Sequence, residues 1–401
     1  MIPFNKALNI ILNQCQTLGT ERKKLEDLAG YATAKPVISK FNSPLFDNSA
    51  VDGYGVLIQD LKNIPCKLKL TGAIFAGDKK NIKLKKGSTI KILTGAKIPS
   101  GVEAVVMKEF CEESNNFVVF KKTARLGENI RKKGEEYLKG KKILDAGTLI
   151  NPQIIGLLAS LGYSSFLVYK KPKVSVVVTG SELIKPGKKL RPGKIYESNS
   201  FSIVSALQGI GINETTLSSV KDNKKNIKKL LYKAIKDSDV IITIGGISVG
   251  DKDYVKDVLR ELGVKTKFST VAMKPAKPNY FGVYKKKLVF GLPGNPVSAI
   301  LSFHELIKPA LLKTIGVKNV SGFNTSAILT HNLKKKSGRL EFVRGELIQK
   351  NGDLLVTPME AQGSHMLSGI CNANSLIYFP QEKEFLSGGE KVEIELLRWT
   401  T

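Results

Sequence analysis

Three short glycine-bearing segments could hold an anionic ligand. Each follows an apolar run and precedes a helical pattern, and they read Thr179-Gly180-Ser181-Glu182, Gly245-Gly246-Ile247-Ser248-Val249-Gly250 and Gly291-Leu292-Pro293-Gly294-Asn295-Pro296. Glycine lets the backbone approach a ligand, and the N–H groups at the start of a helix favour phosphate. One such segment alone is usually an ordinary turn between a strand and a helix. Three together predict an anion-binding crevice, although neither the Walker A pattern nor G-x-G-x-x-G is present.

Acidic side chains accompany the same segments. Glu182 ends the first, Asp251 and Asp253 follow the second, and Asp222 precedes a predicted helix. Asp222 and Asp253 also stand where helix N-caps are expected, so each has a structural explanation of its own. A phosphate-rich ligand beside several carboxylates normally needs a magnesium ion between them. We therefore expect Glu182, Asp222 and Asp253 to form a weak magnesium site that keeps several waters.

Two lysines, Lys274 and Lys277, lie in the segment Met273-Lys274-Pro275-Ala276-Lys277-Pro278. Lysine pairs in so basic a chain are usually solvated surface. Here the prolines restrict the backbone on either side and so hold the lysines in defined positions. A ligand-binding role and a surface role are equally supported by the residues alone.

Three further segments combine turn-forming residues with charge. They are Pro44 to Gly55, which contains Asp52; Ile92 to Pro99, which contains Thr94; and Gly127 to Glu136, which contains Arg131. By composition alone, a tight turn, a hairpin loop and an exposed charged loop are the favoured interpretations.

The elements that must position these residues follow from the apolar pattern. From Lys173 onward, apolar runs alternate with amphipathic helical patterns, which is typical of a doubly wound α/β sheet. The expected strands are almost uninterruptedly apolar, as burial on both faces requires. In such a sheet ligands bind beyond the carboxyl ends of the strands, so the three glycine segments should meet there.

The remaining chain predicts three other domains. Residues 1–44 and 146–170 have helical spacing and are expected to form one discontinuous helical domain. Residues 45–145 contain short β-rich runs between turns and are expected to form an inserted β domain. The α/β domain is expected to cover 171–318, and short strands in 319–401 predict a terminal β barrel or sandwich.

Composition excludes several classes of protein. The net charge of +28 would attract any polyanion, but the lysines lie in short scattered runs without an aromatic ladder, so we expect no specific nucleic-acid partner. The four cysteines and three histidines show no zinc-ligand or disulfide spacing. We find no apolar run of membrane-spanning length and no signal peptide, and we expect a cytoplasmic protein.

Taken in order, these segments resemble the MoeA and gephyrin E-domain family, the molybdopterin molybdenumtransferases. The resemblance extends over nearly the whole chain. Its motifs are F-D-N-S-A-x-D-G-Y at 46–54, T-G-A-x-x-P at 94–99, N-I-R-x-x-G-E at 129–135, T-G-S-E-L at 179–183, G-G-x-S-x-G-x-x-D at 245–253, M-K-P-x-K-P at 273–278 and G-L-P-G-N-P-V-S-A at 291–299. The chain departs from the family pattern at Glu136, where aspartate is frequent, and at Thr270, where lysine is common.

The resemblance implies transfer of molybdenum from molybdate to adenylylated molybdopterin, with magnesium and with release of AMP. It also implies a homodimer whose active site lies between the α/β domain of one subunit and the β domain of the other. The residues that it assigns to catalysis are Asp52, Thr94, Arg131, Glu182, Asp222, Asp253 and Lys274. Together with the segments above, it predicts substrate contacts from Gly180, Ser181, Gly245, Gly246, Ser248, Gly250, Lys277, Pro293, Gly294, Asn295, Pro296 and Ser364.

Two other functions remain as alternatives. The α/β domain also resembles that of the molybdopterin adenylyltransferases, so one alternative is that this chain itself adenylylates the pterin. If it is the molybdenumtransferase, the adenylyltransferase is instead a candidate partner. A gephyrin-type dimer also serves as a non-catalytic scaffold, a role that requires partner domains which we do not expect from this sequence. The sequence does not distinguish molybdate from tungstate, because the two oxyanions have nearly the same size and charge.

Overall fold

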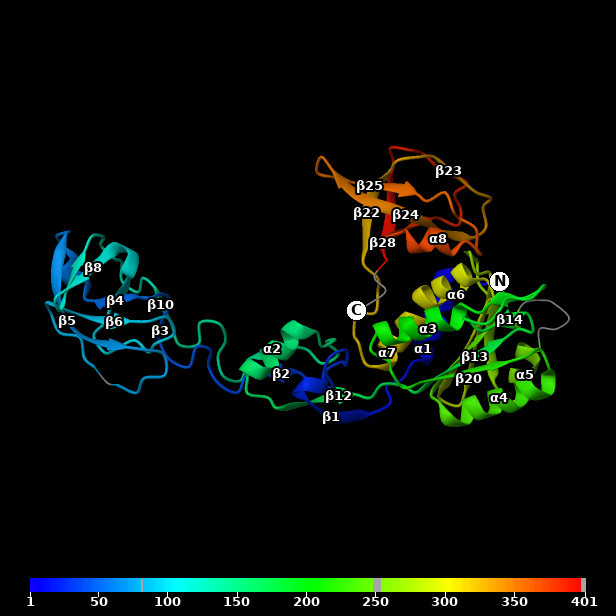
Figure 1. Ribbon diagram of the computed structural model, residues 1–401, viewed down its shortest axis with the longest axis horizontal. Helices are drawn as coiled ribbons and strands as arrows, with labels where there is room; N and C mark the ends of the chain where they lie inside the picture. The colour runs from blue at the N-terminus through cyan, green and yellow to red at the C-terminus, as the bar shows by residue number, and fades with distance from the viewer. Residues whose placement is uncertain (81, 248–253, 398–401) are drawn as a thin grey trace. The chain divides into compact units, whose positions relative to one another are not determined.

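The structure, a computed structural model, describes residues 1–80, 82–247 and 254–397. It contains two compact units. The first consists of Met1–Lys35, Ala146–Gly156 and Ser164–Thr401, and the second of Pro36–Asp145 and Leu157–Tyr163. The chain leaves the first unit after Lys35 and returns to it at Ala146 (Figure 1).

A six-stranded sheet forms the centre of the first unit. Its order is β16 (Thr215–Val220), β13 (Val174–Thr179), β17 (Val240–Ile244), β21 (Lys287–Leu292), β20 (Pro278–Tyr284) and β18 (Lys265–Thr270). The first four strands are parallel, and β20 and β18 continue the sheet in antiparallel pairing. Sequence reasoning anticipated the parallel strands but missed β18, where Lys265, Thr266 and Lys267 break the apolar pattern, and β20, which begins with the last proline of the Met273–Pro278 segment.

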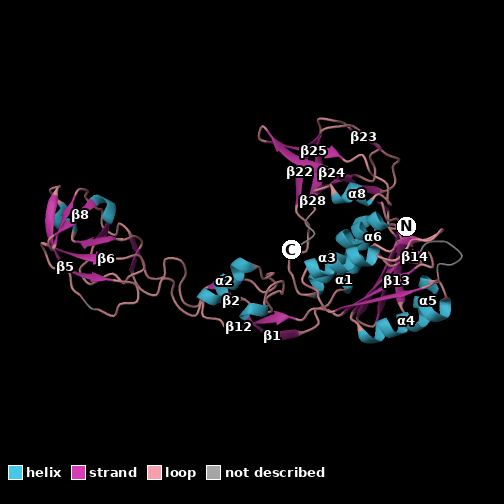
Figure 2. Ribbon diagram, in the orientation of Figure 1, coloured by secondary structure: helices cyan, strands magenta, loops and turns pink. Residues whose placement is uncertain are grey.

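Helices cover both faces of this sheet, as the doubly wound pattern predicted (Figure 2). One face packs on α1 (Phe4–Gln14), α3 (Asn199–Gly209), α6 (Pro296–Ser302) and α7 (Lys308–Thr314), and the other on α4 (Lys224–Asp237) and α5 (Val255–Glu261). Along β13, Val176 and Val178 join the first core while Val177 joins the second. This alternation explains why the strand is apolar at both odd and even positions.

Local sequence explains two of these helices. In α4, Ile227, Leu231 and Ala234 recur on one buried face while the lysines stay exposed. The side chain of Asn223 accepts a hydrogen bond from Asn226 N and caps the helix. Helix α6 begins with Pro296 in its first turn, which leaves no helical hydrogen bond unmade. It continues through a π-helical turn, η4 (Phe303–Ile307), into α7.

The first helix packs differently from our expectation. We expected it to join the helical pattern at 152–161, which forms α2 (Pro152–Ser160). Instead Phe4, Ala7 and Ile11 of α1 are buried in the core of the α/β sheet, and the Phe4 ring lies 5.2 Å from that of Phe342. A periodic apolar face predicts that a helix is buried, but it does not specify the surface that buries it.

The expected helical region around Leu25 is also largely extended. Strand β1 (Thr20–Lys24) pairs antiparallel with β12 (Ser165–Tyr169), and only the single 3-10 turn η1 (Leu25–Asp27) follows it. Among the described residues, no helix is long and apolar enough to cross a membrane.

The C-terminal region closes into the expected barrel. Its five strands are β22 (Asn324–Leu329), β24 (Leu340–Lys350), β25 (Asp353–Pro358), β26 (Ser375–Phe379) and β28 (Lys391–Leu396). Pairing of β24 with both β25 and β26 closes the ring. The short helix α8 (Leu367–Cys371) contributes Ile370 to the core that the barrel shares with the α/β sheet.

The second unit is the inserted β structure. Its sheet has the order β7 (Ala104–Met107), β4 (Gly53–Val56), β6 (Ser88–Ile92), β5 (Cys66–Ile74), β9 (Phe117–Phe120) and β8 (Cys111–Ser114). Two short pairs accompany it, β3 (Asn48–Ser49) with β10 (Ile130–Arg131) and β2 (Val37–Ile38) with β11 (Lys142–Leu144). Buried Tyr54, Val106 and Phe120 belong to one of its two cores.

Candidate active site

A cavity of about 1070 Å³ opens where the parallel strands of the α/β sheet end. The three glycine segments meet there and contribute Gly180, Gly245, Gly246, Pro293, Gly294, Asn295 and Pro296 to its wall. Strands β13 and β17 are neighbours, and their following connections diverge to opposite faces of the sheet, which is the position where open α/β sheets bind ligands. The predicted convergence of the three segments is therefore seen in the structure.

The backbone crosses closely at the second of these segments. Gly245 has a φ of +86°, and a Cβ atom there would lie 2.6 Å from the carbonyl oxygen of Thr179. Gly246 has a φ of +66°, and its Cβ would meet a side-chain carbon of Val255 at 2.7 Å. Both positions therefore require glycine for conformational and steric reasons.

Two of the three predicted magnesium ligands lie in this cavity. Glu182 and Asp222 both line its wall. Asp222 does not cap α4, since Asn223 does so; its Oδ2 accepts a 2.8 Å hydrogen bond from Ser181 N. Ser181 Oγ in turn accepts a 3.1 Å bond from Asp222 N, so Ser181 orients the carboxylate and is not itself among the described lining residues. Ser248, Gly250 and Asp253 lie outside the described residues.

The two lysines of the Met273–Pro278 segment also line the cavity. Lys274 lies on β19 (Met273–Lys274), which pairs with β24 of the barrel, and its Nζ is 2.9 Å from Glu341 Oε1. Lys277 is exposed, and Ala276 between them has a φ of +76°. The Pro-rich segment therefore holds both lysines on a constrained backbone, as the prolines predicted.

A loop of the barrel, residues 362–365, also lines the cavity. Ser364 Oγ accepts a 3.0 Å hydrogen bond from Asn295 Nδ2, and its carbonyl oxygen accepts one from Val297 N in the first turn of α6. The loop is held from behind by Arg344, whose Nη2 donates to the carbonyl oxygens of Ala361 and Gly363. This explains how Ser364, distant in sequence, reaches the same cavity.

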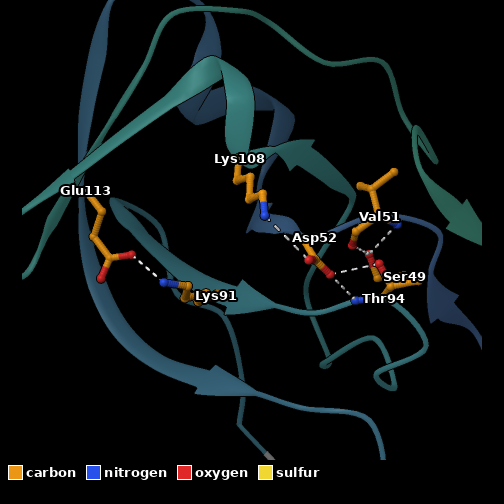
Figure 3. A network of polar contacts seen from close by, with 7 residues as sticks. All are labelled: Ser49, Val51, Asp52, Lys91, Thr94, Lys108 and Glu113. Atoms are coloured by element: carbon orange, nitrogen blue, oxygen red, sulfur yellow. Dashed lines mark hydrogen bonds and ion pairs between the residues drawn. The ribbon is translucent and has the colours of Figure 1, made fainter.

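The other three predicted catalytic residues belong to the second unit. Asp52 Oδ1 accepts hydrogen bonds from Thr94 N at 2.9 Å and from Thr94 Oγ1 at 2.8 Å (Figure 3). Lys108 Nζ lies 3.7 Å from Asp52 Oδ2. The N–H bond from Thr94 and the nearby Lys108 charge lower the pKa of Asp52, and the N–H bond is the larger cause. Asp52 is therefore a carboxylate at neutral pH.

The three signature segments of the second unit lie together. Ser49 N donates to Ala96 O, and Ala50 N donates to Asn129 O, which joins the segment around Asp52 to the other two. Exposed Arg131, on β10, pairs with Asn48 of β3. The composition-based interpretation as separate turns was therefore incomplete: they are turns, but they form one surface of the second unit.

Comparison with known proteins agrees with this architecture. Three family models match, described as the MoeA N-terminal region (domain I and II) at residues 2–162, a probable molybdopterin binding domain at 175–313, and the MoeA C-terminal region (domain IV) at 326–397. The molybdopterin molybdenumtransferase of Haemophilus influenzae is 38% identical over 98% of both chains. That of Bacillus subtilis is 31% identical over 99% of this chain and 94% of its own.

The chain belongs to the MoeA family. A solved structure of a molybdopterin biosynthesis MoeA protein from Pyrococcus horikoshii is also similar, with a TM-score of 0.82, 30% identity and coverage of 99% of this chain and 100% of its own. The resemblance read from seven short motifs is thus confirmed over the full length of a MoeA protein.

The cavity of this MoeA protein also contains residues that sequence reasoning missed. From the barrel region come Arg339, Arg344 and His365, and Tyr196 and Asn199 come from β15 (Ile195–Tyr196) and from the first residue of α3. Arg344 is fully buried, yet its Nη1 has no hydrogen-bond partner. A lone arginine in a strand carries no local sign of its role. Only the pairing of β19 with β24 brings it beside the glycine segments.

Proposed function

We propose that this MoeA protein transfers molybdenum from molybdate to adenylylated molybdopterin in a magnesium-dependent reaction that releases AMP. Family membership assigns the chain to molybdenum cofactor biosynthesis, and the relatives named above are transferases acting on molybdopterin. The reaction, its substrates and the residue roles below are our inference.

One observation carries the proposal: a single cavity is lined by two carboxylates next to the glycine segments and by cations from the barrel and from the Met273–Pro278 segment. The carboxylates are those of Glu182 and Asp222, and the cations include Lys274, Arg339 and Arg344. A phosphoanhydride and a separate oxyanion match this lining, because a magnesium ion held by the carboxylates would bind the phosphoanhydride while the cations would bind the oxyanion. The volume of about 1070 Å³ is large for a single small ligand and suits a pterin joined to a nucleotide.

The described residues fit a magnesium ion of this kind. Mg²⁺ in phosphate-binding sites is usually held by one or two carboxylates together with substrate oxygens and water. Glu182 and Asp222 supply two carboxylates on one wall, and the hydrogen bond from Ser181 N fixes the orientation of the second. Bound there, the ion would neutralise charge on the phosphoanhydride and improve AMP as a leaving group.

The cations of the lining would hold the oxyanion. Buried Arg344 retains an unpartnered Nη1 donor, which an oxyanion in the cavity would satisfy. Lys274 is paired with Glu341, so its charge is partly offset until an anion binds. Ser364 and Asn295 join the barrel loop to the third glycine segment through their hydrogen bond and would orient the pterin.

We further propose that the active protein is a homodimer in which the second unit of one subunit completes the cavity of the other. Asp52, Thr94 and Arg131 are polar residues of the signature segments on the second unit. No function within that unit is proposed for them. In this arrangement Asp52 and Thr94 would orient the oxyanion or a water, and Arg131 would add a positive charge. The four free thiols suit the reducing cytoplasm, where we infer that the protein acts.

The decisive experiment incubates the purified protein with adenylylated molybdopterin, Mg²⁺ and molybdate. AMP release and molybdenum in the pterin are measured, and tungstate replaces molybdate in a parallel series. We expect AMP release that requires both Mg²⁺ and an oxyanion. Formation of adenylylated molybdopterin from ATP and molybdopterin, without oxyanion-dependent AMP release, would instead identify an adenylyltransferase.

A further inference from the structure

A second group of titratable side chains is buried between the α/β domain and the barrel, away from the cavity described above. His304 and Glu305 lie on the π-helical turn η4, and Glu395 lies on β28. Their exposed fractions are 5%, 5% and 6%. One ligand atom from each can be chosen so that all three lie within 4.8 Å of one another. Of the described residues, no other three His, Cys, Asp or Glu side chains meet this spacing.

The hydrogen bonds within this group leave one carboxylate oxygen without a donor. His304 Nε2 lies 3.0 Å from Glu395 Oε1, and the Tyr378 hydroxyl donates to Glu395 Oε2 at 2.6 Å. The same hydroxyl is 3.5 Å from Glu305 Oε2, at the limit of a hydrogen bond. Glu305 Oε1 is buried and has no hydrogen-bond partner. A buried carboxylate oxygen without a hydrogen-bond donor is costly, and a second carboxylate, that of Glu395, belongs to the same group.

The surroundings have a charge opposite to that of the whole protein. The group opens into a cavity of about 830 Å³ whose described lining contains Glu305, Glu382, Glu393 and Glu395 but only one cation, Lys308. The chain as a whole carries 63 Lys and Arg against 35 Asp and Glu. A local excess of carboxylates in so basic a protein favours a bound cation at this position.

We propose that His304, Glu305 and Glu395 bind one divalent transition-metal ion of the zinc class. An imidazole nitrogen with two carboxylate oxygens is a donor set that such ions accept, and the cavity beside it leaves room for a water as a fourth ligand. Mg²⁺ prefers an all-oxygen shell, so this site is distinct in chemistry from the one at Glu182 and Asp222.

The ion would act as a structural link. His304 and Glu305 come from the helix that ends the α/β domain, whereas Glu395 comes from the last barrel strand, 91 positions after His304. The connecting segment also closes over the group: a Cβ atom on Gly322 would lie 2.0 Å from Glu395 Oε1. Metal binding would therefore fix β28 and the segment before β22 against η4.

The test uses the full chain after removal of metals with a chelator. Zn²⁺ binding is measured by competition with a chromophoric zinc chelator, and Co²⁺ binding by visible absorption. We expect the wild type to bind one more equivalent of Zn²⁺ than Glu305→Gln, and its melting temperature to rise with Zn²⁺ while that of the variant does not. Co²⁺ should give d–d absorption in the wild type that Glu305→Gln loses.

Glu393→Gln is the matched control, because it removes a carboxylate from the same cavity outside the group of three. It should keep the wild-type stoichiometry and the Co²⁺ spectrum. His304→Gln provides a second test if Glu305→Gln folds poorly, as judged by circular dichroism. Equal zinc stoichiometry in the wild type and both ligand variants would overturn the proposal and leave the two carboxyl groups to share a proton.

Discussion

At the residue scale, Asp222 is the side chain whose role the structure changes most. Its position before α4 is that of a capping residue, but Asn223 caps the helix and Asp222 turns toward the cavity. The bond from Ser181 N holds it there. A carboxylate that a hydrogen bond orients into a cavity, rather than into its own helix, is available to a metal or a substrate.

Replacing Asp222 with asparagine should therefore impair catalysis with little effect on the fold. We expect Asp222→Asn to lower the rate of AMP release at least about tenfold and to raise the Mg²⁺ concentration required. The measurement is AMP release as a function of Mg²⁺ concentration. Asp237→Asn is the control, because Asp237 is exposed at the other end of α4; an equal loss in both variants would count against a role for Asp222.

Burying the charged side chain of Lys171 lowers the stability of the folded protein. Its Nζ lies 3.8 Å from the centre of the Tyr31 ring, and burial lowers its pKa to about 8, with a smaller effect from Lys23. Between this pKa and its ordinary value of 10.5, the unfolded chain binds more protons at this lysine than the folded chain. The free energy of unfolding should therefore rise with pH through this window.

Lys171→Met should remove that dependence. Below pH 8 the wild type must keep a half-buried ammonium group, so we expect the variant to be more stable by about 1 kcal/mol, a value reduced for partial solvent screening. The advantage should shrink as the pH approaches 10. Chemical denaturation at pH 7, 8.5 and 10 measures it, and exposed Lys170→Met should show no such trend. A constant difference across these pH values would contradict the assignment.

At the scale of single elements, the turn after β17 depends on close backbone packing. Gly245 combines a positive φ with a Cβ position 2.6 Å from Thr179 O, and that neighbour is backbone of the adjacent strand. Gly187 has a φ of +84° but nothing within 4 Å of its Cβ position. Comparing substitutions at the two glycines therefore distinguishes the cost of conformational strain from the cost of steric conflict.

Gly187→Ala should cost only the strain of a left-handed residue, about 1 to 2 kcal/mol. Gly245→Ala should cost roughly 1 to 3 kcal/mol more, because the sheet must move to admit the methyl group. Thermal and urea unfolding measure the stability loss in both variants. In Gly245→Ala, a bound ligand should also stabilise the α/β domain against unfolding less than in the wild type. Similar losses in the two variants would show that the contact with Thr179 is easily relieved.

At the scale of the whole molecule, the proposed site is shared between subunits. A cavity on the first unit contains Asp222, and a polar surface on the second unit contains Asp52. In a homodimer with crossed sites, a subunit damaged at Asp52 and a subunit damaged at Asp222 would form one intact site between them.

Mixing Asp52→Asn with Asp222→Asn, after dissociation and reassembly, should therefore restore activity to about a quarter of the wild type, since half the dimers are mixed and each has one of two sites intact. Each variant reassembled with itself serves as the control. Recovery no greater than the two controls would show that the residues act within one subunit or not at all.

The sequence by itself determined the features that depend on neighbouring residues. The apolar run Val174 to Thr179 became a fully buried strand, because a strand that is apolar on both faces must be covered on both. Gly245 and Gly246 became a turn with positive φ at the end of β17, which glycine adopts without strain. The seven motifs, in their order along the chain, also indicated the family. Any sequence with the same residue types at these positions is expected to form the same local features.

Only the tertiary structure decided which surfaces meet. The sequence predicted a helix near the N-terminus but not that Phe4 would pack on Phe342, and it did not separate Asp222 from the cap at Asn223. Arg344 reaches Ala361 and His304 reaches Glu395 through contacts whose partners no periodicity specifies. Such contacts arise because several faces of similar polarity compete for burial, and packing of the whole core selects among them.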